Sequence, residues 1–253
     1  MSACRLNALS PSARGWLRIA ASLASVAFVT ISTAMGALAA TDPYAGLRAG
    51  YDVSYPQCGA PAPAGTFGIV GVNGGRPFSY SSCLSAEYAA APTSIAPSLY
   101  INMGYSGAYR RDIAPSCSTL SMSVPGTRRQ EQAWAIGCSE AQTSMSYATQ
   151  QGATSPAAWW LDVETADSWS SSDLSLNRFA IQGAVTILAE SGLPVGIYSS
   201  ASMWSAITGG NFTPASVAAD WETAGGSCTA PFTSSPVWLV QSTSSGFDAD
   251  TTC

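Results

Sequence analysis

Two carboxylates stand two residues apart in the segment WWLDVET, which has the composition of a buried strand. Side chains alternate between the faces of a strand, so Asp162 and Glu164 share one face, while Leu161 and Val163 share the other. Neighbouring carboxylates in a partly dry site repel each other, which can raise one pKa and keep that group protonated as a general acid. The pattern predicts carboxylate acid–base chemistry; the alternative is an exposed strand end with two solvated acids.

Other acids also lie in or after strand-like segments. Asp52 stands within the otherwise apolar segment GYDVSY, where an unpaired charge would be costly. Asp220 in SVAADWE and Asp248 in GFDAD follow strand-like stretches, but each could instead cap a helix or form an Asx turn, as could Asp250. We therefore take Asp52 as a further site candidate and leave both interpretations open for Asp220 and Asp248.

The absence of two residue types limits the kinds of catalytic site that the chain can form. The 253-residue chain has no His, and its ten basic residues are all Arg. These absences exclude Ser-His-Asp and Cys-His triads, His-based zinc sites, Walker A lysines and Schiff-base enzymes, and they leave little room for an esterase or protease. Any acid–base catalysis must use Asp, Glu, Tyr or Cys, and we expect neither a metal nor a cofactor.

Residues 1–40 have the three-part build of a secretory signal. Three Arg and no acid precede an apolar stretch, 19–40, which closes with an A-x-A pattern. An uncleaved membrane anchor is the alternative, because this stretch is long enough to span a bilayer. We expect cleavage near Ala40 or Thr41, a secreted or cell-wall-associated protein, and no stable membrane insertion afterwards.

Loss of this signal would leave 7 Arg against 15 acids, a net charge of −8. Binding to nucleic acid through charge is therefore not expected. Residues 41–253 have the length of one domain, without an internal repeat, and we expect a monomer.

Six cysteines follow the predicted signal. In an exported chain an even set indicates disulfides, for which 15 connectivities are open. A metal site is disfavoured, because the chain has no C-x-x-C pair and no His to complete one. We predict that neighbours in sequence pair, each bridge closing a loop of about 21–26 residues. The expected pairs are Cys58–Cys83, Cys117–Cys138 and Cys228–Cys253.

Short apolar runs alternate with helix-like segments along residues 41–253. Strand-like runs such as FGIVGV, SLYINMGY and PVGIYSS are separated by helix candidates such as RQEQAWAIGCSEAQTSMSYATQQG and LNRFAIQGAVTILAESG. This alternation predicts an α/β fold with a parallel sheet, open or closed. The helices shorten from Trp204 onward, so we expect loops to join the last strands. In a closed barrel, Asp162 and Glu164 would point inward near the strand's carboxyl end, where barrel enzymes place their chemistry.

The motifs resemble glycoside hydrolase family 25, the muramidases that cleave bacterial peptidoglycan. GYDVSYPQ is similar to the family's first strand and WLDVE to its fourth-strand D-x-E. PVGIYSS and SVAADW resemble the fifth and sixth strands, and VQSTSSG with FDAD resembles the closing strand and its final Asp. The similarity covers about residues 48–250. It departs from the family pattern at Asn73, which stands near an expected acid, and at Val240 and Ser242, where the family favours aromatic residues.

This resemblance implies a single TIM-like barrel of about five β/α units followed by three mostly helix-free strands. It also implies that Glu164 is the general acid, that Asp162 assists at the substrate's N-acetyl group, and that Asp52 and Asp248 line the sugar site. Strand Trp residues can stack on sugars, although burial is their default. The expected substrate-binding residues are Tyr105, Trp160, Tyr198, Asp220, Trp221 and Gln241.

The leading hypothesis is a secreted glycosidase that hydrolyses β-1,4 bonds of peptidoglycan or a related N-acetylated glycan. The alternative is a catalytically inactive barrel that binds glycan or protein at the cell surface. The acidic charge favours the alternative, because peptidoglycan is itself anionic. The presence of both Asp162 and Glu164 favours the enzyme.

Overall fold

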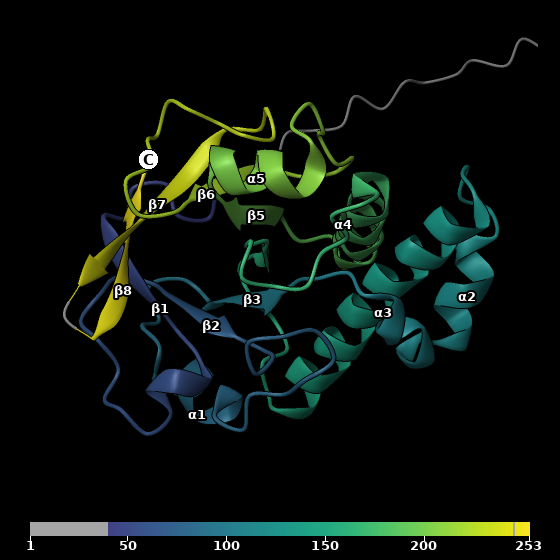
Figure 1. The fold of residues 1–253 in the computed structure, drawn as a ribbon. Coiled ribbons are helices and arrows are strands. Elements are labelled where there is room, and N and C mark those ends of the chain that lie inside the picture. Colours follow the sequence, from purple (N-terminus) through teal and green to yellow (C-terminus); the bar gives the residue numbers. More distant parts are fainter. Residues whose placement is uncertain (1–39, 245) are drawn as a thin grey trace, which may run out of the picture. The chain divides into compact units, whose positions relative to one another are not determined.

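The computed structural model describes residues 40–244 and 246–253, so the predicted signal lies almost wholly outside the described residues. The strands of the described part are β1 (Ala49–Val53), β2 (Gly68–Gly71), β3 (Ser98–Asn102), β4 (Trp159–Asp162), β5 (Val195–Ser199), β6 (Ala219–Glu222), β7 (Val237–Ser244) and β8 (Phe247–Thr252). They close into one barrel, in which each strand pairs with its neighbours in sequence and β8 pairs with β1 (Figure 1). The α/β barrel predicted from the sequence is therefore confirmed.

The closing strand differs in direction from the others. Strands β1 to β7 run parallel, and β8 is antiparallel to both β7 and β1. Strand β7 ends at Ser244 and β8 begins at Phe247, which leaves room for a hairpin but not for the long crossover that a parallel pair needs. The β–α alternation alone predicted a parallel sheet; the short final connection reverses the last strand.

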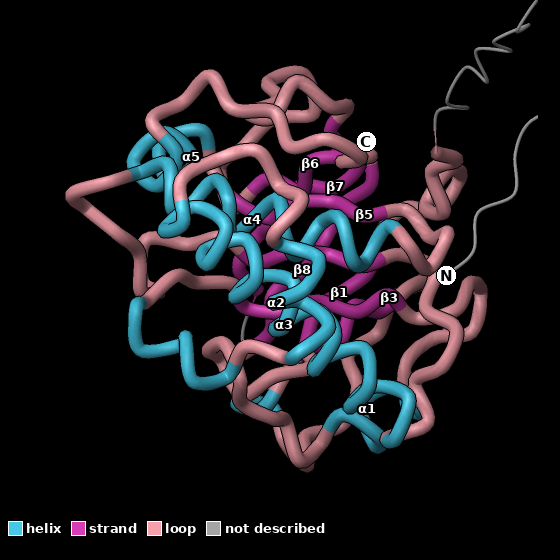
Figure 2. Tube along the Cα trace, turned by 90° about the vertical axis from the view of Figure 1, so that its right-hand side faces the viewer, coloured by secondary structure: helices cyan, strands magenta, loops and turns pink. Residues whose placement is uncertain are grey.

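Helices connect most of the strands. They are η1 (Tyr55–Gln57), α1 (Leu84–Ala90), η2 (Gly107–Asp112), α2 (Pro115–Ser121), α3 (Arg128–Gln150), α4 (Leu174–Ala189) and α5 (Ala201–Thr208), where η marks a 3-10 helix. Figure 2 shows the strands with the helices lying over them. Only η1 stands in the first connection, and β6 to β8 follow one another without a helix in the described residues, as expected. No helix of the described part is long and apolar enough to cross a membrane.

Strand alternation separates two apolar layers. Outward-facing residues such as Leu99 and Leu161 belong to a cluster that also includes buried residues of α3 and α4, such as Trp134 and Ile181. A second cluster, centred on Trp160, fills the barrel interior. The Trp160 ring lies where a side chain at Gly196 would otherwise stand, and its Nε1 donates to the Tyr44 hydroxyl at 2.8 Å. Because this core fills the interior, the carboxyl-terminal end of the strands is left for a site.

Glycines allow the two longest helices to approach closely. A Cβ added to Gly183 of α4 would overlap the Trp134 carbonyl oxygen of α3, and one added to Gly137 of α3 would overlap the Ala180 carbonyl oxygen. Gly183→Ala is therefore expected to push the helices apart and to cost about 1–3 kcal/mol of stability, a fall of several degrees in Tm. Thermal unfolding checks this, with Gly107→Ala as control because its Cβ would meet only ordinary van der Waals contact. Equal Tm values for the two variants would contradict the close packing.

All six cysteines of the described part are paired. The bridges join Cys58 to Cys83, Cys117 to Cys138 and Cys228 to Cys253, with Cα–Cα distances of 5.6, 5.7 and 5.4 Å. This is the pairing between neighbours in sequence that we predicted. The second bridge ties α2 to α3, and the third fixes the end of the chain beside the loop that follows β6.

Candidate active site

The predicted acids gather at one end of the barrel. Asp162 is the last residue of β4, and Glu164 follows it by two positions. Asp52 of β1 stands opposite Asp248 in the β1–β8 register. Because β8 is antiparallel to β1, its beginning lies at the same barrel end as the carboxyl ends of the parallel strands. This is the end at which barrel enzymes place their chemistry.

These acids line a single cavity of about 130 Å³. Its lining consists of Asp52, Tyr100, Asp162, Glu164, Tyr198, Trp221, Gln241 and Asp248. Tyr100 is the one member that the sequence analysis missed. It could have been found from strand alternation, since Leu99 and Ile101 on either side of it are fully buried in the layer under the helices.

Neutral hydrogen-bonding groups hold the acids. Gln241 donates from Nε2 to Asp52 Oδ2 at 3.0 Å, and its Oε1 accepts from the Tyr198 hydroxyl at 2.7 Å. Tyr198 is also the register partner of both Asp162 and Trp221 on the neighbouring strands. Among the described residues, no Arg lines this cavity. The carboxylates therefore lack a cation that would stabilise their charged forms.

Burial and mutual repulsion raise the pKa values of these acids. Burial, with the charges of Asp248 and Glu164, raises the pKa of Asp52 to about 7. Burial and then the charge of Glu164 hold the pKa of Asp162 well above its usual range. Burial also raises the pKa of Glu164, and Asp248 adds to this shift. The cluster thus retains protons at a pH where isolated carboxylates have lost them, which is what general acid catalysis requires.

A further buried carboxylate reaches Asp162 through two asparagines. The Asn102 side-chain amide donates to Asp162 Oδ2. Asn73 is paired with the Asn102 backbone, accepting from its N–H at 3.1 Å and donating to its carbonyl at 3.0 Å. The Asn73 amide also donates to Glu140 Oε1 at 3.2 Å. The neutral Asn73, at which we noted a missing acid, therefore lies beside an acid that comes from α3.

Glu140 is expected to make the protein less stable as the pH rises. Burial raises its pKa to about 7, although Phe78 N, Ser144 Oγ and the Asn73 amide all donate to it. A carboxyl group whose pKa is higher in the folded state binds its proton more tightly there, and this tighter binding stabilises the folded protein. The stabilisation is fully present below about pH 4.5 and is lost as the pH rises through 7.

Wild-type Tm should therefore fall between pH 5 and pH 8, and Glu140→Gln should make that fall shallower because Gln has no proton to lose. Thermal unfolding at several pH values measures this, with Glu190→Gln at the exposed end of α4 as the control. If the Tm of the Glu140 and Glu190 variants falls with pH as steeply as that of the wild type, Glu140 does not cause the loss of stability.

Three predicted substrate-binding residues do not line the cavity. Trp160 is 0% exposed and lies deeper in the barrel, two residues before Asp162 on the same strand face. Asp220 is also fully buried, and its carboxylate accepts from the backbone N–H groups of Phe232 and Thr233 at 2.7 and 2.9 Å. These partners are 12 and 13 residues away along the chain, so Asp220 holds the loop before β7 and makes neither the helix cap nor the Asx turn that we had left open. Tyr105 lies along a separate groove.

Asp248 and Asp250, which the sequence could not separate, have different surroundings. Asp248 lines the cavity, whereas Asp250 is fully buried and accepts from Trp221 Nε1 at 2.9 Å. Burial and then the charge of Asp52 hold the pKa of Asp250 well above its usual range. Asp250 therefore supports the Trp221 side chain from below the cavity.

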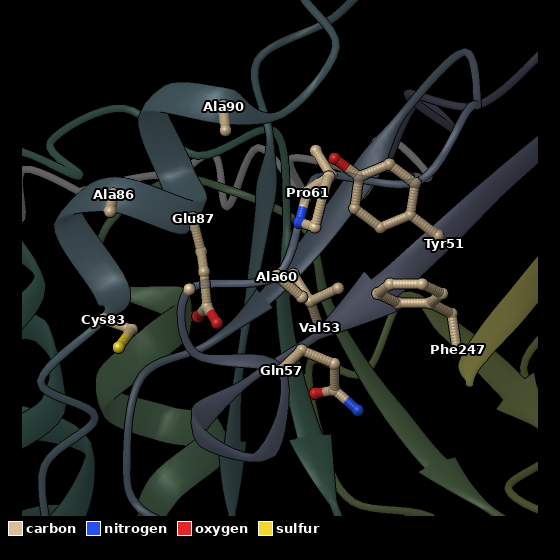
Figure 3. A pocket seen from close by; sticks show the side chains of 12 residues that line it. Tyr51, Val53, Gln57, Ala60, Pro61, Cys83, Ala86, Glu87, Ala90 and Phe247 are labelled. Atoms are coloured by element: carbon tan, nitrogen blue, oxygen red, sulfur yellow. The ribbon is translucent and has the colours of Figure 1, made fainter.

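A different hollow lies outside the barrel, between β1 and α1 (Figure 3). It has a volume of about 190 Å³, and its lining is mostly apolar, with Tyr51, Val53 and Phe247 on the strand side. Glu87 of α1 points into it. None of the acids predicted from the sequence lines this hollow, so the acid cavity remains the candidate active site.

The chain is similar to known lysozymes. A family model described as lysozyme-like protein 1 matches residues 132–221. No curated protein matches the sequence. A family GH25 lysozyme from Aspergillus fumigatus shares 16% identity and a TM-score of 0.55, over 81% of this chain and 93% of that one. The bacterial lysozyme from Streptomyces coelicolor shares 16% identity and a TM-score of 0.51, over 81% and 91%.

A third solved structure is the modular autolysin LytC from Streptococcus pneumoniae, in complex with a synthetic peptidoglycan ligand. It shares 11% identity and a TM-score of 0.54 with this chain, and the match covers 81% of this chain and 46% of that one. The low identities agree with the departures seen at Asn73 and around Gln241. The chain therefore has the barrel fold of the glycoside hydrolase family 25 lysozymes, in a divergent form.

Proposed function

We propose that this protein is a glycosidase that hydrolyses β-1,4 bonds of peptidoglycan or a related N-acetylated glycan. The observation that carries the proposal is the convergence of Asp52, Asp162, Glu164 and Asp248 in one cavity, which no Arg of the described residues lines, at the carboxyl-terminal end of a lysozyme-like barrel. The lysozymes whose fold this chain shares, and the autolysin solved with a synthetic peptidoglycan ligand, support the substrate class.

Glu164 acts as the general acid in this proposal. It is only partly buried and borders the cavity, while Asp162 is 8% exposed. Its raised pKa lets it keep a proton, which it delivers to the departing sugar oxygen as the glycosidic C–O bond breaks. Water then adds its oxygen to the anomeric carbon of the other sugar and gives up a proton, which restores the protonated carboxyl group.

The other groups bind and orient the sugar. Asp162, held by Asn102, assists at the N-acetyl group. Asp52 and Asp248 line the same sugar site, with Gln241 and Tyr198 as hydrogen-bonding partners. This arrangement needs only carboxyl, amide and hydroxyl groups, in keeping with a chain that has no His and no Lys.

The proposal includes export. Three disulfides and the composition of residues 1–40 support a secreted or cell-wall-associated protein. N-terminal sequencing of secreted protein should start near Ala40 or Thr41. An intact Met1 in a membrane fraction would show an anchored protein instead.

Loss of turbidity from a suspension of purified cell walls, together with release of reducing ends, tests the function. We expect both to occur with wild-type protein. Binding to the walls without any release of reducing ends would instead establish the rival function, an inactive barrel that binds glycan.

A further inference from the structure

A polar groove with a volume of about 640 Å³ lies beside the candidate active site. Its walls are the segment that follows β3, the first turns of α3 and the segment that follows β4, and its lining includes Tyr105, Arg110, Arg129, Gln132, Asp167 and Trp169. Two of its walls therefore follow the same strand ends that carry Asn102 and Asp162. The glycosidase proposal assigns no role to this groove.

The groove is built on the backbone of the catalytic segment. Trp169 Nε1 donates to the carbonyl oxygen of Glu164 at 2.7 Å, and the Tyr105 N–H donates to the Ser168 carbonyl at 2.7 Å. The buried Asn177 fixes the far side of this segment by hydrogen bonds in both directions to the Ser170 backbone, each of 2.9 Å. A ligand in the groove would therefore lie at a fixed place relative to Glu164.

Charge is distributed unevenly along the groove. Asp167 contributes a carboxyl whose pKa burial and the nearby Glu164 raise to about 7. Arg110 and Arg129 contribute two guanidinium groups, although the chain from residue 41 holds 7 Arg against 15 acids. The carboxyl groups of the candidate active site and the two guanidinium groups of the groove thus lie in adjoining hollows.

The two arginines have donors to spare. Arg110 Nε donates to the Gly107 carbonyl at 2.8 Å, which holds the side chain in place, while its terminal nitrogens have no partner within the described residues. Arg129 makes no side-chain hydrogen bond or ion pair in the same part of the chain. The neighbouring Arg111 differs, because it pairs with Asp112 at 3.6 Å. Guanidinium groups with free donors are well suited to carboxylates, which they bind through charge-assisted hydrogen bonds.

We propose that this groove binds a carboxylate of the peptide attached to the wall glycan, an inference that rests on the glycosidase function proposed above. The sugar chain occupies the acid cavity, and its peptide branch extends over the segment that follows β4 to Arg110 and Arg129. The local positive charge also answers the objection that an acidic protein is unsuited to an anionic substrate, because the cations stand where the substrate's carboxylates would lie.

The test compares two forms of one substrate. Soluble peptidoglycan strands are used as isolated, or after their peptide carboxylates have been converted to amides, which removes charge and changes little else. The measured quantity is the ratio of kcat/KM on the native strands to kcat/KM on the amidated strands. We expect about a ten-fold preference of the wild-type protein for native strands at low salt, and a smaller one at high salt.

Matched variants assign the effect to the groove. Arg110→Gln combined with Arg129→Gln should bring the ratio close to one. Arg111→Gln combined with Arg128→Gln removes the same number of charges from the adjacent positions, which do not line the groove, and should keep the wild-type ratio. An unchanged ratio in the first pair, or an equal loss in both pairs, would overturn the proposal. If the preference for native strands is lost only after phosphate polymers are removed from the wall, the ligand of the groove is a phosphate. That result would also overturn the proposal.

Binding measurements keep this inference separate from the proposed function. Co-sedimentation of the Glu164→Gln protein with native and amidated walls gives the same comparison without turnover. If neither wall form is hydrolysed by wild-type protein, the glycosidase proposal fails, and the binding ratio still decides whether Arg110 and Arg129 recognise carboxylates.

Discussion

Glu164→Gln is expected to fold like the wild-type protein and to hydrolyse wall glycan about 100-fold to 10,000-fold more slowly. The change keeps the size of the side chain and much of its hydrogen bonding, but an amide cannot deliver a proton to the departing sugar oxygen. Glu164 borders the cavity, and its carbonyl oxygen is held by Trp169, so the backbone should stay in place. Initial rates of reducing-end release from purified walls measure the effect.

Glu190→Gln is the matched control for this prediction. Glu190 is exposed at the end of α4, so its replacement should leave the rate within about two-fold of wild type. Circular dichroism and Tm should show that both variants are folded. A folded Glu164→Gln protein with the wild-type rate would mean that the proton donor is a different residue.

Asp162→Asn is expected to reduce turnover by about 100-fold, a magnitude typical of a lost electrostatic contact at the reacting centre. Asp162 Oδ2 accepts from the Asn102 amide, and Oδ1 is a buried acceptor without a partner within the described residues, so one oxygen at the cavity wall is left unsatisfied. In the Asp162→Asn variant, the new NH₂ group must point either at the NH₂ group of Asn102, where two donors meet, or into the cavity, where the substrate meets a donor in place of an acceptor.

The pH profile and the Tm separate this role from a structural one. Burial and the charge of Glu164 hold the pKa of Asp162 well above its usual range, so Asp162→Asn removes no negative charge while Glu164 titrates, and the alkaline limb of the activity profile should keep its position. Asp112→Asn, a surface change in the Arg111 ion pair, should alter neither the rate nor the profile. Reduced activity accompanied by a lowered Tm would indicate that Asp162 only supports the fold.

Strand alternation was the part of the sequence that predicted the site best. It placed Asp162 and Glu164 on one face, and the structure puts both at the cavity. Alternation fixes the face of a residue but not its depth, which is why Trp160, on the same face, lies instead within the packed interior. It also allows only one of two adjacent residues to face inward. Trp221 does so, while Asp220 faces the loop that contains Thr233.

Contacts between distant segments could not be predicted. Glu140 lies on α3, 67 residues after Asn73, and no local pattern links a helix carboxylate to the end of β2. The helices between β3 and α3 were also missed, because the segment around Pro115 lacks helical periodicity and begins its short α2 with that proline. The groove beside the active site is lined by segments that lie far apart in the sequence, so no local pattern brings Arg110 and Arg129 together.

Analysis of the products released from purified peptidoglycan tests most directly whether the carboxylate cavity is a glycosidase site. The secreted protein is incubated with walls, and the soluble products are reduced and examined by mass spectrometry alongside those of Glu164→Gln. We predict products cut within the glycan chain, each with a new reducing end and one added water per bond broken, from wild-type protein and almost none from the variant. Wild-type protein that binds the walls tightly but releases no new reducing ends would contradict the proposed function.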